Sequence, residues 1–176
     1  MALRRGARPR FERVGMVIMD VDGVLTDAGM YYAESGDEWK KFNTRDGHGI
    51  TLLHQAGIKT ALVTRERTAI VARRALKLGI AEVHQGILDK LPVVRALLEK
   101  HGVAREEACY IGDDLGDLGV MRFIGLAVAV GDALPAIKEV AHLVTRKKGG
   151  EGAVREVCDL ILAARARAAR REGARR

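Results

Sequence analysis

The sequence predicts a single α/β domain built on a doubly wound parallel sheet. Two observations predict it: short apolar runs alternate with helix-like segments, and polar residues directly follow several of these runs. Continuous apolar strands are typical of a sheet that is buried on both faces, and such sheets are parallel. A chain of 176 residues, 48% of them hydrophobic, is long enough to enclose one hydrophobic core.

The expected strands and helices follow one another in the order that a doubly wound fold requires. Four apolar runs are expected to be strands, at residues 16–19, 60–63, 108–111 and 126–130. Helix-like segments occupy residues 47–56, 66–78, 90–101, 114–122 and 135–140. Asp89 is expected to cap the third helix, with Pro92 in its first turn. A last helix begins near Gly152 and runs into an Arg-rich end.

Residues 29–43 interrupt this alternation. Two short runs with aromatic residues flank the turn-rich stretch 34–37, which predicts a β-hairpin. Because the hairpin follows the first acidic motif directly, we expect it to stand over the site as a flap. It holds Tyr31, Tyr32, Trp39 and Phe42, so we expect it to be covered by a partner subunit or by substrate.

The net charge of +7 is concentrated at the two ends of the chain. Residues 1–13 hold five Arg and one Glu, and residues 165–176 hold six Arg and one Glu, so the part between carries −2. We therefore expect solvated, frayed basic tails at 1–13 and 165–176 around a domain at 14–164. Nucleic acid is a disfavoured partner, because the positive charge does not belong to a folded face and aromatic residues are few.

Composition also limits the cellular setting. No apolar run approaches the ~20 residues needed to span a bilayer, so a membrane protein is not expected. No apolar signal segment separates the Arg-rich N-terminus from the first motif, which favours a cytoplasmic protein. Cys109 and Cys158 lack the context of a zinc cluster or a disulfide framework, and we expect both to be buried and reduced.

The strongest chemical signal follows the first apolar run, where Asp20 and Asp22 stand two residues apart. Phosphoryl transfer needs an oxygen nucleophile, a proton donor for the leaving alkoxide and a cation to offset charge. Asp20 could attack phosphorus, and Asp22 could protonate the leaving group. Gly23 would let backbone amides approach a phosphate. Two unpaired carboxylates after a buried strand would be costly without a cation, so a merely solvated loop is disfavoured.

Three acids crowd the start of a helix after the third apolar run: Asp113, Asp114 and Asp117. Helix capping explains one or two of them, and a hard cation bound by carboxylates explains them better. Thr64 follows the second run, where its hydroxyl could bind a phosphoryl oxygen. Lys90 begins a helix, where a cation is unfavourable unless its ammonium binds phosphate and Asp20.

The stretch Asp-Val-Asp-Gly-Val-Leu-Thr-Asp at 20–27 resembles the first motif of the haloacid dehalogenase superfamily. The resemblance implies a Rossmann-like fold, an aspartyl-phosphate on Asp20, and Asp22 as general acid and then base. It implies Mg²⁺ as cofactor, bound by Asp20, by the backbone carbonyl of Asp22 and by Asp113. Thr64 and Lys90 match the phosphate-binding motifs two and three, and Asp114 and Asp117 would contribute through water or by orienting the ligands.

The chain has room only for the hairpin flap and not for a separate cap domain. In this respect it resembles the capless branch of the superfamily. Further stretches at 41–47, 110–115 and 149–156 are similar to phosphatases of 3-deoxy-D-manno-octulosonate 8-phosphate and of 2-keto-3-deoxynonulosonate 9-phosphate. The resemblance implies a small sugar-acid phosphate as substrate and a homotetramer in which the hairpins pack together.

The substrate within this class is left open by the residues. Glu66 and Lys77 match the nonulosonate branch, whereas residues 153–160 look like the octulosonate enzymes. Relatives usually carry Gly where Arg65 stands, so Arg65 could reshape the loop or reach the substrate. Arg155 is a further candidate for the substrate carboxylate, and His48 lies beside the expected flap.

Four alternatives compete with this interpretation. A sugar-phosphate mutase would share the acidic motifs but would normally need a cap domain. A phosphatase-like module associated with an acylneuraminate cytidylyltransferase need not be catalytic, yet all four motif residues are present here. A phosphatase of nucleic-acid ends is favoured only by the basic tails. A phosphatase of another small phosphorylated metabolite would use the same motifs.

Overall fold

The computed structural model describes residues 11–174. Its centre is a six-stranded sheet in the order β5-β4-β1-β6-β7-β8, with every neighbouring pair parallel. In that order the strands are Glu82–His84, Lys59–Val63, Met16–Met19, Ala108–Gly112, Leu126–Ala129 and Leu143–Val144. The chain starts at a central strand and winds outward to both edges, so the predicted doubly wound parallel sheet is confirmed.

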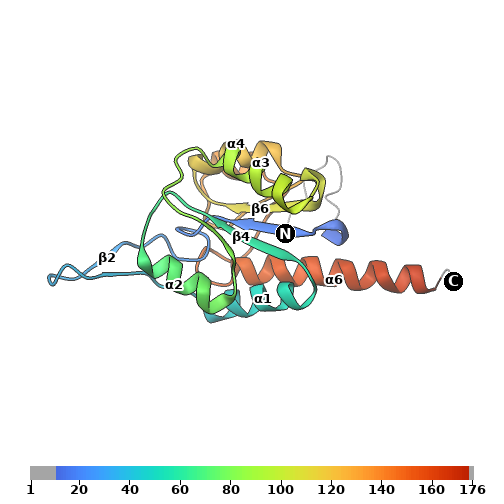
Figure 1. Cartoon of the computed structure of the whole chain (residues 1–176), viewed down its shortest axis with the longest axis horizontal. Coiled ribbons are helices and arrows are strands. Elements are labelled where there is room, and N and C mark those ends of the chain that lie inside the picture. Colours follow the sequence, from blue (N-terminus) through green and yellow to red (C-terminus); the bar gives the residue numbers. More distant parts are fainter. Residues whose placement is uncertain (1–10, 175–176) are drawn as a thin grey trace.

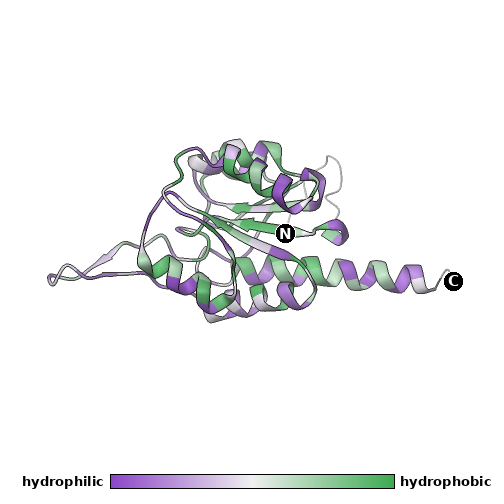
Figure 2. Ribbon diagram, viewed as in Figure 1, coloured by the Kyte–Doolittle hydropathy of each residue, from purple (hydrophilic) through white to green (hydrophobic). Residues whose placement is uncertain are grey.

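Helices cover both faces of the sheet (Figure 1). Helices α1, α2 and α6 lie on one face, and α3 and α4 lie on the other. The α-helices α1 to α6 are Thr44–Gln55, Ala69–Leu78, Lys90–His101, Leu118–Phe123, Pro135–Val140 and Ala153–Gly173. The 3₁₀-helices η1 to η3 are Phe11–Arg13, Arg105–Glu107 and Leu115–Asp117. Figure 2 shows the apolar central strands enclosed between these amphipathic helices, which is why the strands are buried.

Capping residues set where the helices begin, and so shape the loops at the carboxyl edge of the sheet. The side chain of Asn43 accepts from the backbone N–H of Arg45 at the start of α1. Thr68 caps α2 in the same way, and Asp89 caps α3 as predicted. Each cap of this kind contributes about 1 kcal/mol to helix stability. Residues 65–68 are therefore loop rather than helix, which leaves them free to line a site.

The predicted hairpin is present and projects away from the sheet (Figure 1). Strand β2 (Tyr31–Tyr32) pairs antiparallel with β3 (Glu38–Trp39). At the base of the hairpin, Thr26 and Phe42 form an isolated antiparallel bridge. The bridge ties the hairpin stem to the loop that follows β1.

Some elements differ from the expectation. Strands β5 and β8 were not predicted, because both are sheet edges and edge strands need not be apolar on both faces. The helix expected at 114–122 is divided into η3 and α4. The expectation of frayed tails is wrong for residues 165–173, which continue α6, and for Phe11–Arg13, which form η1 against α6. Residues 1–10 and 175–176 of the expected tails lie outside the described residues.

Two simpler expectations also have outcomes. Cys109 and Cys158 are buried and free, as predicted. Among residues 11–174, none of the helices combines the length and the apolar character that crossing a bilayer would require.

Candidate active site

Three neighbouring strands deliver the predicted residues to one edge of the sheet. Asp20 follows β1, Thr64 follows β4 and Asp113 follows β6, and β1 lies between the other two. Carboxyl ends of parallel strands are the usual ligand-binding edge of such folds. A cleft of about 410 Å³ lies there, lined by Asp20, Asp22, Ala28, Thr64, Arg65, Glu66, Leu88, Lys90, Asp113, Asp114 and Gly116.

Asp20 is held at both carboxylate oxygens. Its Oδ1 accepts from the backbone N–H of Val21 at 2.7 Å, and its Oδ2 lies 2.6 Å from the Nζ of Lys90. Two contacts on one short side chain fix its rotamer, while each oxygen keeps a second lone pair. Asp20 is therefore a preoriented carboxylate that lines the cleft.

Lys90 is buried and shared between two acids. Its Nζ contacts Asp20 and also lies 2.7 Å from Oδ1 of Asp117. Burial alone would lower the pKa of Lys90, but the two carboxylates outweigh burial and raise it. Lys90 stays charged in the core because these acids pair with it, which explains the unfavourable lysine at the start of α3.

Asp117 has hydrogen-bond partners at both carboxylate oxygens and leaves no position open for a metal ion. Its Oδ1 also accepts from the hydroxyl of Tyr110 at 2.6 Å, and its Oδ2 accepts from the backbone N–H groups of Asp113 and Asp114. Four donors thus occupy the lone pairs of this carboxylate. The side chain of Asp117 orders the loop after β6 and holds Lys90 toward Asp20.

Acids outnumber cations in the cleft, and the pKa values register this imbalance. Burial, then the charge of Asp117, raises the pKa of Asp20 to about 6 despite the opposing effect of Lys90. Burial, then the charges of Asp20, Asp117 and Asp114, raises the pKa of Asp113 to about 8. Two carboxyl groups that resist ionisation together mark a place where a further cation would be favourable.

The donor set fits a hard divalent cation. Oxygens of Asp20, Asp113 and Asp117 lie within 4.8 Å of one another. Oδ1 of Asp113 is buried and has no hydrogen-bond partner among the described residues, so it is free to bind an ion. Because Asp117 is saturated, we assign the open ligand positions to Asp20 and Asp113. Carboxylate oxygens are the ligands that Mg²⁺ prefers.

Gly23 permits the close approach of the two acidic motifs. It has a positive φ of +82°, and a Cβ at this position would overlap the carboxylate of Asp113. On the other side of the same loop, Gly149 packs against the backbone of Gly23, and the N–H of Gly150 donates to the carbonyl of Val24. The Gly-rich segment before α6 therefore supports the first motif within its own subunit.

Lys40 is a residue that the sequence prediction missed. Its Nζ lies 2.6 Å from Oδ1 of Asp22, and its side chain is fully buried. Nothing in the sequence distinguishes Lys40 from its neighbour Lys41, because only the folded hairpin brings it to the first motif.

The predicted substrate residues fall into two groups. Arg65 and Glu66 line the cleft, on the loop between β4 and α2. His48 and Lys77 are exposed on α1 and α2 and do not line it. Thr64 lines the cleft as expected, and Asp114 lies exposed at its rim, where it caps η3. The structure thus brings together the chemical residues, but only two of the five substrate candidates.

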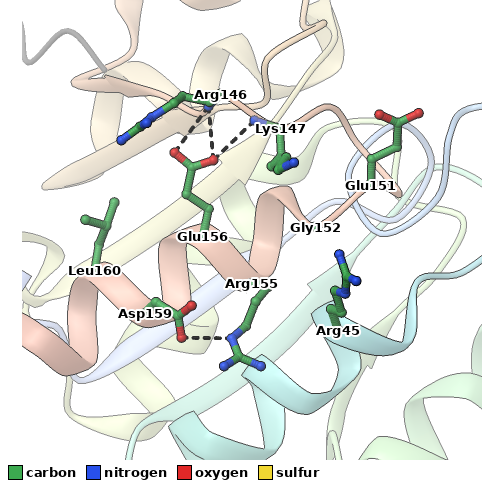
Figure 3. A pocket seen from close by; sticks show the side chains of 9 residues that line it. All are labelled: Arg45, Arg146, Lys147, Glu151, Gly152, Arg155, Glu156, Asp159 and Leu160. Atoms are coloured by element: carbon green, nitrogen blue, oxygen red, sulfur yellow. Dashed lines mark hydrogen bonds and ion pairs between the residues drawn. The ribbon is translucent and has the colours of Figure 1, made fainter.

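Arg155, the fifth candidate, belongs to a different cleft of about 440 Å³ at the start of α6 (Figure 3). This cleft is lined by Arg45, Arg146, Lys147, Glu151, Gly152, Arg155, Glu156, Asp159 and Leu160. The Nε of Arg155 donates to Asp159 at 2.8 Å, and Glu156 accepts from the backbone N–H groups of Arg146 and Lys147. Within one subunit, Arg155 is therefore placed for helix stability rather than for the acidic cleft.

Comparison with known proteins finds relatives that belong to one family. The sequence profile of the haloacid dehalogenase-like hydrolases matches residues 74–157. The 3-deoxy-D-manno-octulosonate 8-phosphate phosphatase of Yersinia pestis is 48% identical over 155 residues, which are 88% of this chain and 83% of that protein. The protein of the same name from Escherichia coli K12 is 46% identical and covers 87% and 81%.

Solved structures agree with the sequence relatives. The Yersinia pestis phosphatase superposes with a TM-score of 0.88 at 47% identity, covering 89% of this chain and 85% of that chain. The phosphatase of Moraxella catarrhalis, in complex with magnesium, phosphate and KDO, gives a TM-score of 0.87 at 41% identity, covering 89% and 90%. A cobalt-bound octulosonate 8-phosphate phosphatase from Haemophilus influenzae gives 0.86 at 39% identity, covering 89% and 92%.

Proposed function

The chain belongs to the haloacid dehalogenase superfamily and is a phosphatase, and from this premise we propose that it hydrolyses 3-deoxy-D-manno-octulosonate 8-phosphate. One observation carries the chemistry: Asp20 is held between Lys90 and a backbone N–H, and it faces Asp113 across a cation-deficient cleft. The curated relatives quoted above carry the name of this activity at 46–48% identity, which supports the substrate.

In the first chemical step, an oxygen of Asp20 attacks phosphorus, and the bond between phosphorus and the sugar oxygen breaks. Asp22 gives its proton to the departing alkoxide, so the sugar leaves as a neutral alcohol. Thr64 and Lys90 bind phosphoryl oxygens, with Gly23 allowing the backbone of its loop to approach them. This step leaves an aspartyl-phosphate on Asp20 and an ionised Asp22.

In the second step, water attacks the phosphorus of the aspartyl-phosphate. Asp22 takes a proton from this water, inorganic phosphate leaves, and both carboxyl groups return to their starting states. Mg²⁺, held by Asp20, by the backbone carbonyl of Asp22 and by Asp113, would offset the negative charge on the transferring phosphoryl group. Asp114 and Asp117 keep the loop after β6 in place for this role.

The sugar acid itself must be recognised at the mouth of the cleft. Arg65 and Glu66 are the cleft-lining residues there, and they offer a bidentate cation for a carboxylate and an acceptor for sugar hydroxyls. His48, Lys77 and Arg155 lie elsewhere in the subunit, so they reach substrate only if a neighbouring subunit presents them.

The deciding experiment is phosphate release from a panel containing the octulosonate 8-phosphate, the nonulosonate 9-phosphate, neutral hexose phosphates and 5′-phosphorylated oligonucleotides. We expect the highest kcat/KM for the octulosonate phosphate. A preference for the nonulosonate phosphate, lost when Glu66 and Lys77 are exchanged together for Ala, would assign the chain to the nine-carbon substrate instead. Equal hydrolysis of neutral hexose phosphates would contradict the sugar-acid class, and no hydrolysis at all would favour a non-catalytic module.

We also infer a homotetramer that packs through its hairpins. Tyr31, Tyr32 and Trp39 are 42%, 71% and 66% exposed on a projecting two-stranded element, and such elements are marginal alone. Light scattering at micromolar concentration should give four times the mass of the chain. Trp39→Glu should reduce that mass, whereas Leu76→Glu, an exposed apolar position on α2, should not.

A further inference from the structure

The buried ammonium of Lys40 is an unexplained feature of the flap. Lys40 directly follows β3, and its side chain has no exposed surface. A lysine is rarely buried unless it is paired, because removing its charge from water is costly. Its near partner is Asp22, at 2.6 Å, and the carboxylate of Glu38 stands farther off, at 3.9 Å.

This contact determines which oxygen of Asp22 remains free. Oδ1 accepts from Lys40 and, at 3.4 Å, from the hydroxyl of Thr26. Oδ2 is buried and has no hydrogen-bond partner among the described residues. A carboxyl group held at one oxygen cannot rotate freely, so the contact at Oδ1 also fixes the direction of Oδ2.

The hairpin stem positions Lys40 through several independent contacts. The Nζ of Lys41 lies 3.2 Å from Asp27, and the hydroxyl of Tyr31 donates to the same carboxylate at 2.7 Å. The bridge between Thr26 and Phe42 closes the base of the stem. These contacts hold the hairpin stem, and with it Lys40, against the first motif.

We propose that Lys40 is a positioning residue that orients Asp22 for proton transfer to the leaving group, and so makes this step depend on the docked flap. The proposal rests on the proposed function, because it assigns Asp22 as the proton donor. Lys40 itself transfers no proton. It holds Oδ1 while the proton on Oδ2 passes to the sugar oxygen as the phosphorus–oxygen bond breaks.

The leaving group supplies a readout that a merely structural lysine would not move. A sugar alkoxide is a poor leaving group and needs a proton, whereas p-nitrophenolate leaves without one. General acid catalysis contributes about 10²–10⁴-fold to such steps. Lys40→Met should therefore lower kcat/KM for the sugar phosphate by about 10–100-fold, while lowering kcat/KM for p-nitrophenyl phosphate by less than about 3-fold. Because kcat/KM reports only the steps up to departure of the leaving group, the hydrolysis of the aspartyl-phosphate that both substrates share does not enter this comparison.

Two matched variants complete the test. Lys59→Met removes an exposed lysine at the start of β4, and the ratio of the two kcat/KM values should stay at its wild-type value. Lys40→Arg keeps a cation in the stem and should restore part of the ratio. If Lys40→Met does not fold, Lys40→Gln, which retains a hydrogen-bond donor of smaller reach, replaces it in the same comparison.

The role of Lys40 and the proposed function are tested by different measurements. An unchanged ratio in folded Lys40→Met overturns the positioning role, whatever the absolute rates. The wild-type rate on sugar phosphates tests the proposed function by itself. If the wild type prefers a different alkyl phosphate, that ester takes the place of the sugar phosphate, and the ratio still decides the role of Lys40.

Discussion

Two clusters of ionisable side chains in this protein have opposite charge balance. In the cleft, Asp20, Asp113 and Asp117 share one cation, Lys90, and burial together with mutual repulsion raises the pKa of Asp20 to about 6 and of Asp113 to about 8. On β5, the single carboxylate of Glu82 faces several bases, and hydrogen bonds lower its pKa to about 2.

The cluster on β5 is complete as it stands. Oε1 of Glu82 lies 2.6 Å from Lys100 and 2.8 Å from His101, and Oε2 lies 3.2 Å from His84. The hydrogen bond from Lys100 is the largest cause of the lowered pKa. Residues of the chain supply partners for both carboxylate oxygens of Glu82, so the cluster needs no further ligand.

The comparison teaches that charge deficit marks the functional cluster better than the number of charged residues. Both clusters bring several ionisable groups together, but only the cleft leaves a buried carboxylate oxygen of Asp113 without a partner. A fold tolerates that cost where a ligand supplies the missing charge. The following predictions test the contrast, from the largest expected effect to the smallest.

Asp20→Asn should reduce phosphatase activity by at least about 1000-fold, because the amide cannot act as the nucleophile. Glu82→Gln, the same isosteric change in the complete cluster, should leave kcat/KM within about twofold. Steady-state phosphate release from both purified variants, with circular dichroism to confirm folding, makes the measurement. Comparable losses in the two variants would remove the functional distinction between the clusters.

Mg²⁺ should stabilise the wild-type protein without any substrate. Saturation to 100 times Kd contributes about 2.7 kcal/mol, which corresponds to roughly 5–10 °C in the melting temperature of a chain of this size. Asp113→Asn should lose most of this shift, and Glu82→Gln should keep it. Thermal melts with and without chelator provide the measurement, and a full shift in Asp113→Asn would show that the ion binds elsewhere.

In chelator, the wild-type protein should lose stability as the pH rises from about 4 to about 8. The folded protein holds protons on Asp20 and Asp113 in this range, because their pKa values are raised to about 6 and about 8, while the unfolded chain releases them near its ordinary value of 3.8. Glu82 is ionised in both states above about pH 5, so it adds no pH dependence there.

Urea midpoints at pH 5 and pH 8 measure this dependence of stability on pH. Asp113→Asn removes the group with the larger shift, so its midpoint should change less between the two pH values than that of the wild type. A wild-type midpoint that rises over this interval would contradict the raised pKa values.

Glu82→Gln should destabilise the protein by less than about 1 kcal/mol, because ion pairs near the surface contribute little. The effect should be present near pH 7 and vanish as the pH falls from 4.5 toward 2, since Glu82 has a lowered pKa and its contribution depends on ionisation. Urea midpoints of wild type and variant at pH 7 and pH 3 give the comparison. If Glu82→Gln lost more stability at pH 3 than at pH 7, the pH dependence assigned to Glu82 would have the wrong sign.

Local sequence was sufficient for the parts of the protein in which each residue acts near its neighbours. The apolar runs before Asp20 and Asp113 predicted buried parallel strands, and the rule that ligands bind at their carboxyl ends predicted that these acids meet. The cap of α3 by Asp89 and the hairpin at 29–43 were likewise readable from short patterns. Such features depend on turn chemistry and periodicity, which are local properties.

Contacts between distant segments were decided only by the tertiary structure. The ion pair of Lys40 and Asp22 spans 18 residues, and the saturation of Asp117 by Lys90 and Tyr110 joins three elements. No periodicity encodes these pairings, because they arise when the hairpin and α3 pack against the loops after β1 and β6. The sequence by itself determined which chemical groups reach the cleft, whereas the packing of the chain decided which of them remain open to substrate and metal.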